Sequence, residues 1–117
     1  MTHRMKIIQE KIGLDELHQM AEQSFGNFVK GVVDVQQEIL AVDAEMHSDL
    51  EALLVEQGSK QEYLWGINLY PELTGDDFIE FDSMINLRPA VGNRSRGVEN
   101  EGTRMHIREV VTKLITD

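Results

Sequence analysis

Three arginines stand in one short segment, residues 86–97, of an otherwise acidic chain. The segment joins Arg88, Arg94 and Arg96 to a proline and two glycines. Glycine lets a backbone approach a ligand closely, and arginine forms bidentate hydrogen bonds with phosphate and carboxylate groups. The combination predicts a loop that holds an anionic group.

Two neighbouring features extend this predicted site. Asn93 offers a side-chain amide, and the last predicted helix begins close by, where backbone N–H groups lack partners within the helix. The predicted ligand-binding residues are Arg88, Asn93, Arg94, Arg96 and Arg104. Neither a Walker lysine motif nor a GxGxxG pattern occurs, so the familiar nucleotide-binding loops are not indicated.

The same arginines have a purely structural interpretation. The chain contains 21 Asp and Glu residues against 11 Lys and Arg, so ion pairs within the fold form easily. Arg88, for example, could pair with Glu80 or Asp82 on a neighbouring strand. The sequence leaves both interpretations open.

A second cluster places acidic residues and a histidine at every second position. Asp43, Glu45, His47 and Asp49 would point the same way on an extended segment, which suits a divalent cation. Alternatively, His47 or Asp49 could act as an acid–base catalyst. We favour a solvated acidic turn, with Asp49 near a helix start, and predict no bound metal and no cofactor.

Four other side chains carry more than one interpretation. Trp65 either packs in the core or stacks on a ligand. His18 and His106 lie beside apolar stripes and are expected to be half-buried and hydrogen-bonded, and Ser83 lacks a surrounding GxSxG.

Composition limits the class of protein. The net charge of −10 argues against binding to nucleic acids or anionic membranes. The chain has no cysteine, no run of about 18 apolar residues, and no apolar N-terminal stretch typical of a signal peptide. A cytoplasmic protein is therefore expected.

Hydrophobic periodicity predicts eight elements in the order β-α-β-β-α-β-β-α. Their ranges are 5–12, 14–24, 28–35, 38–42, 48–57, 63–70, 78–87 and 102–115. The turn between the third and fourth falls at Gln36-Gln37, and one long strand is the alternative there. Ser48 and Glu51 form a capping-box pattern, Gly58 marks a helix end, and Glu109 with Lys113 forms an i,i+4 pair.

This order predicts one α+β domain over residues 1–117. A mixed or mostly antiparallel sheet of about five strands is packed by three helices, which we expect on one face. Residues 1–4 are predicted to be frayed.

Several segments resemble a known family. They are 64–71, 78–89 and 92–97, with 45–49, and the likeness extends over nearly the whole chain from about Met5. The chain is similar to a family of small uncharacterised prokaryotic proteins, a domain of unknown function. The resemblance implies a single domain and supplies no catalytic residues.

Three functional hypotheses follow, and the sequence does not decide whether the protein is an enzyme. The favoured one is a ligand-binding or regulatory module that holds an anionic small molecule, or an acidic protein segment, in the loop 86–97. The second is a small enzyme with the cluster 43–49 opposite that loop, which requires the two to lie within about 10 Å. The third is a non-catalytic protein-interaction domain. The oligomeric state is not predicted.

Overall fold

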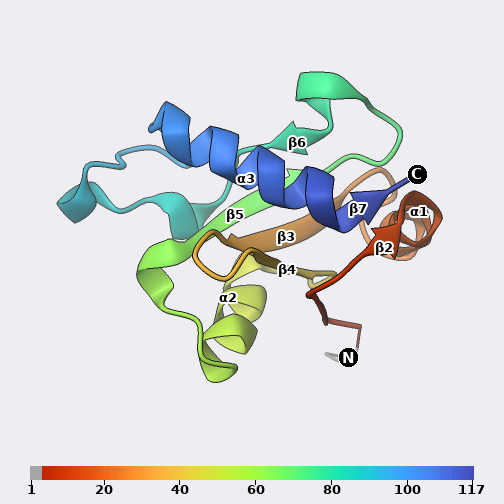
Figure 1. The fold of residues 1–117 in the computed structure, drawn as a ribbon, viewed down its shortest axis with the longest axis horizontal. Helices are drawn as coiled ribbons and strands as arrows, with labels where there is room; N and C mark the ends of the chain where they lie inside the picture. The colour runs from red at the N-terminus through yellow and green to blue at the C-terminus, as the bar shows by residue number, and fades with distance from the viewer. Residues whose placement is uncertain (1–3) are drawn as a thin grey trace.

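A five-stranded antiparallel sheet forms the centre of the structure, a computed structural model that describes residues 4–117 (Figure 1). Its strands, in spatial order, are β1 (Lys6–Ile8), β4 (Ile39–Val42), β3 (Val29–Asp34), β5 (Leu64–Leu69) and β6 (Ile79–Glu80). A separate two-stranded parallel sheet pairs β2 (Ile12–Gly13), from the N-terminal part of the chain, with β7 (Ile115–Thr116), from its C-terminal part. The predicted α+β class is confirmed; of the residues predicted to be frayed, 1–3 lie outside the described part of the chain.

The helices cover both faces of the sheet, and the prediction of one covered face is wrong. α1 (Leu14–Glu22) and α3 (Glu101–Leu114) pack on one face, where Figure 1 shows α3 crossing in front of β3 and β5. α2 (His47–Glu56) packs on the other. The reason is visible in β3, where the consecutive residues Val32 and Val33 are both fully buried but belong to separate apolar clusters.

The first predicted strand and the following hairpin are confirmed with changed bounds. Residues 5–12 split into β1 and β2 around an exposed bend. The β3–β4 turn lies at Gln36-Gln37 as predicted, because the buried Asp34 carboxylate accepts hydrogen bonds from both backbone N–H groups, at 2.9 and 3.0 Å.

Two predicted helix interactions are wrong. α2 begins at His47 and has Met46 at its N-cap, so Ser48 lies inside the first turn and makes no capping hydrogen bond. Lys113 forms an ion pair with Glu38 of the β3–β4 turn, at 2.7 Å, and within the described residues it does not form the predicted pair with Glu109. The predicted helix end is confirmed, since Gly58 has a φ of 109°.

The predicted strand 78–87 is mostly absent. β6 ends at Glu80, and a 3-10 turn, Met84–Asn86, follows after a short extended stretch. The Ser83 hydroxyl accepts a hydrogen bond from the N–H of Ile85, and the Ser83 N–H donates to the Arg96 carbonyl. These local bonds replace a strand ladder and turn the chain into the arginine loop.

Candidate functional site

Side chains of the loop replace a missing strand along β5. β6 pairs only with Asn68 and Leu69, which leaves the polar backbone groups of Leu64 and Gly66 without a neighbouring strand. The fully buried Asn86 fills this gap: its Oδ1 accepts from the N–H of Gly66 at 2.8 Å, and its Nδ2 donates to the Gly66 carbonyl at 3.0 Å. Arg88 donates to the Leu64 carbonyl at 2.6 Å. The loop is therefore attached to the sheet edge.

Asn93 holds the loop in shape. Its Nδ2 donates to the carbonyls of Asn86, Ser95 and Gly97 at 2.7 to 3.2 Å, and its Oδ1 accepts from the N–H of Glu99 at 2.9 Å. The amide predicted to meet a ligand is engaged within the loop. We assign it the task of fixing the loop conformation.

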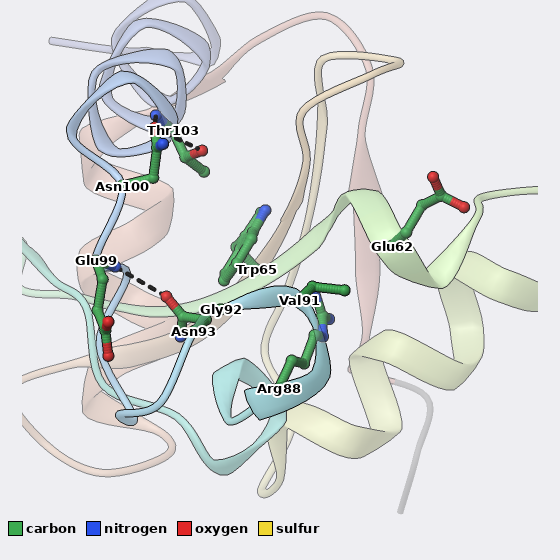
Figure 2. A pocket seen from close by; sticks show the side chains of 9 residues that line it. All are labelled: Glu62, Trp65, Arg88, Val91, Gly92, Asn93, Glu99, Asn100 and Thr103. Atoms are coloured by element: carbon green, nitrogen blue, oxygen red, sulfur yellow. Dashed lines mark hydrogen bonds between the residues drawn. The ribbon is translucent and has the colours of Figure 1, made fainter.

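A cavity of about 590 Å³ opens between this loop, β5 and the start of α3 (Figure 2). It is lined by Glu62, Trp65, Arg88, Val91, Gly92, Asn93, Glu99, Asn100 and Thr103. Figure 2 shows Trp65 near the middle, with Arg88 on one side and the first residues of α3 on another. Trp65 also packs against the core, so both of its predicted roles are compatible with its position.

Arg88 brings positive charge to this cavity. Its guanidinium lies over the Trp65 ring, 4.9 Å from the ring centre, and Nη2 is 3.8 Å from the Glu51 carboxylate. Burial lowers the pKa of Arg88, but a guanidinium stays charged at neutral pH. Within residues 4–117, Nε and Nη1 of Arg88 donate no hydrogen bond, so these donors are available to a ligand.

The start of α3 forms another wall. The side chain of Asn100 caps the helix by accepting from the N–H of Thr103 at 2.9 Å. The N–H groups of the first two helical residues, Glu101 and Gly102, have no partner within the helix, and the helix dipole makes this end positive. Arg104 lies outside the lining; it donates to the carbonyls of Val98 and Glu99 and so fixes the segment before the helix.

The remaining loop arginines point elsewhere, so the three guanidinium groups do not converge on one space. Arg96 pairs with Asp82 at 2.7 Å and lines a separate, smaller cleft. Arg94 is exposed, and in the described chain only its backbone N–H is engaged, with the Glu99 carboxylate at 2.9 Å.

The acidic cluster 43–49 does not form one face. Asp43 has a φ of 77°, and α2 begins at His47, so the segment is not extended as the metal interpretation required. Asp43 is buried 3.8 Å from Arg4, and burial raises its pKa. Nowhere in residues 4–117 do three His, Cys, Asp or Glu residues gather in a way that could hold a metal.

His47 does meet the arginine loop. It is buried, and its Nε2–H donates to the Ile67 carbonyl at 2.8 Å. Loss of hydration lowers the pKa of its imidazole. His47 and Arg96 line the same cleft, whereas Asp49 lies exposed on α2. His106 contacts Glu38 at 3.0 Å, and His18 is half-buried on α1.

Asn86 and Gly66 are two residues of this site that no sequence pattern indicated. Asn86 falls on the polar face of a predicted strand, where an asparagine has no special meaning. The one available signal was a glycine directly after the tryptophan, since glycine inside a strand often marks the close approach of another segment.

The fold and the cavity define a small α+β domain with an Arg- and Trp-lined cavity at the open edge of its sheet. The chain belongs to the family described as protein of unknown function (DUF5674), whose family model matches residues 6–114, in agreement with the resemblance seen in the sequence. No curated protein and no solved structure shows a significant match. Across the described residues, every helix is too short or too polar to cross a membrane.

Proposed function

We propose that this protein is a small-molecule-binding module that holds an anionic ligand in the cavity beside Trp65. The observation that carries the proposal is the position of Arg88, which lines the cavity and whose Nε and Nη1 donate no hydrogen bond within residues 4–117. The positive end of α3 lies on another wall of the same cavity.

The lining limits the kind of ligand. A volume of about 590 Å³ lies within the range of about 300–1,000 Å³ usual for small-molecule sites. Glu62 and Glu99 lie on different sides of Trp65 in Figure 2 and disfavour a second negative group near them. A ligand with one phosphate or carboxylate group and a flat apolar body, which can stack on the indole, fits best.

Trp65 gives a direct test, because it is the only tryptophan in the chain. Its fluorescence is followed while inorganic phosphate, AMP and benzoate are added separately. Saturable quenching or a spectral shift is expected with AMP or benzoate. No change with any of the three at millimolar concentration contradicts the proposal.

Arg108 supplies a matched control for Arg88. Its guanidinium lies 5.1 Å from the centre of the Phe81 ring, outside the Trp65 cavity. Arg88→Gln should weaken binding at least about tenfold, the effect of losing one charge-assisted contact, whereas Arg108→Gln should leave it unchanged. An equal loss of affinity in both variants would show that binding depends on the net charge of the protein and not on the position of Arg88.

A further inference from the structure

A second cleft lies beside the start of α2 and shares no residue with the Trp65 cavity. Its volume is about 160 Å³, and it is lined by Lys30, Glu45, Met46, His47, Ser48, Ser83, Met84, Ile85 and Arg96. These residues come from β3, from the start of α2 and the two residues before it, from the stretch 83–85 before the arginine loop, and from Arg96 within that loop. Segments far apart in the sequence therefore build one small polar space.

Two cations border the cleft with donors available. Arg96 uses Nε to contact Asp82, and its two Nη groups donate no hydrogen bond within residues 4–117. Lys30 forms no ion pair in the same part of the chain; its Nζ lies 5.2 Å from the centre of the Phe25 ring and 6.0 Å from that of Phe28. Glu45 also lines the cleft and Asp82 pairs with Arg96, so the cleft offers an anion the N–H donors of Arg96 and Lys30 rather than an excess of positive charge.

Ser83 of the lining carries a buried hydroxyl. Ser83 is only 1 % exposed, and its Oγ accepts from the N–H of Ile85 at 3.2 Å. Within the described residues the hydroxyl proton of Ser83 has no acceptor. A buried donor without an acceptor is unfavourable, and an oxygen atom of a ligand in the cleft would supply one.

The imidazole of His47 is fixed next to these donors. Its Nε2–H donates to the Ile67 carbonyl, which sets the tautomer of the neutral ring. Burial is the main cause that lowers the pKa of His47, and the charge of Lys30 adds to it. The Ile67 carbonyl, Asn68 and the Asp82 carboxylate act in the opposite direction. Met46 gives the start of α2 no side-chain cap; its carbonyl accepts from the N–H of Asp49 at 3.1 Å, and the N–H groups of His47 and Ser48 have no partner within the helix.

We propose that this cleft binds a phosphate-sized oxyanion, held by Arg96, Lys30 and the Ser83 hydroxyl at the start of α2. A space of about 160 Å³ is large enough to admit a phosphate group. This site is independent of the ligand proposed for the Trp65 cavity.

The test is a titration of the whole ¹⁵N-labelled chain with inorganic phosphate, followed by amide NMR. Saturable shifts are expected at residues 46–49 and 83–85 and at Arg96, with Trp65 fluorescence unchanged. Because the fluorescence reports on the other cavity, either proposal can fail alone. Shifts spread over the whole surface, or no shift at tens of millimolar phosphate, would overturn this one.

Arg94 is the matched control, since it is exposed two residues from Arg96 and does not line the cleft. Arg96→Gln and Lys30→Gln should each weaken phosphate binding about tenfold, and Arg94→Gln should not. The dispersion of each amide spectrum shows that the variant is folded. An equal effect of Arg94→Gln and Arg96→Gln would refute a defined site.

Discussion

Replacement of Asn86 by alanine tests how the arginine loop is attached to the fold. The Asn86 amide serves both polar backbone groups of Gly66, at 2.8 and 3.0 Å, and also donates to the Arg96 carbonyl at 2.9 Å. The Arg96 carbonyl keeps a partner in the variant, because the Ser83 N–H also donates to it. The Gly66 N–H and C=O lose theirs.

The magnitude follows from these two groups. Each buried polar group left without a partner costs about 1–3 kcal/mol, so Asn86→Ala should lower the free energy of unfolding by about 4 kcal/mol. A domain of 117 residues has a total stability of about 6–15 kcal/mol. The variant should therefore stay folded but be clearly weakened.

Urea unfolding of the wild type and the variant measures this difference by linear extrapolation. Asn100→Ala is the matched control, because Asn100 caps α3 at an exposed position and its loss should cost only about 1 kcal/mol. If the two variants lose the same amount, with unchanged m-values, Asn86 does not replace a strand and the reasoning is refuted.

Three further outcomes are expected. Gly66→Ala should lower the free energy of unfolding by about 2 kcal/mol in a urea titration, because the added Cβ would lie 2.5 Å from the Cβ of Ser83; stability equal to the wild type contradicts this packing. Gly58→Ala should cost about 1 kcal/mol in the same assay, since its φ of 109° is strained for any side chain; a gain in stability would exclude the left-handed helix end. Burial lowers the pKa of His47 below its ordinary value of 6.5. Below pH 6.5 the unfolded chain therefore binds a proton that the native state does not, and the free energy of unfolding decreases as the pH is lowered. Urea titrations at pH 7.5 and 5.5 should show a smaller pH-dependent loss for His47→Gln than for the wild type, and equal losses would refute the shift.

Strong local patterns determined much of this fold. The apolar periodicity of residues 14–22 and 101–114 predicts α1 and α3 within two residues at each end, and the β-branched residues of 29–34 and 39–42 predict the central hairpin. The positive φ at Gly58 was also predictable, because glycine is the residue that a helix end of this kind needs. These features depend on interactions between residues close in sequence.

Contacts between distant residues decided the site. The sequence alone places Arg88, Arg94 and Arg96 in one loop, but the directions of two of them depend on residues elsewhere in the chain. Arg88 contacts Leu64 and Trp65, and Arg96 pairs with Asp82. The strand predicted for 78–87 ends at Glu80 because Ser83 and Asn86 bond to backbone groups instead of a partner strand.

The sequence by itself thus determined the class of fold, the main elements and the segment that borders both cavities. Only the tertiary structure showed that Arg88 lies beside Trp65 whereas Arg96 lies in another cleft with His47. It alone also showed that helices cover both faces of the sheet. The physical reason is that helix and turn preferences are local, whereas the partner of a charged or amide side chain is set by whichever backbone groups the packed sheet leaves unpaired.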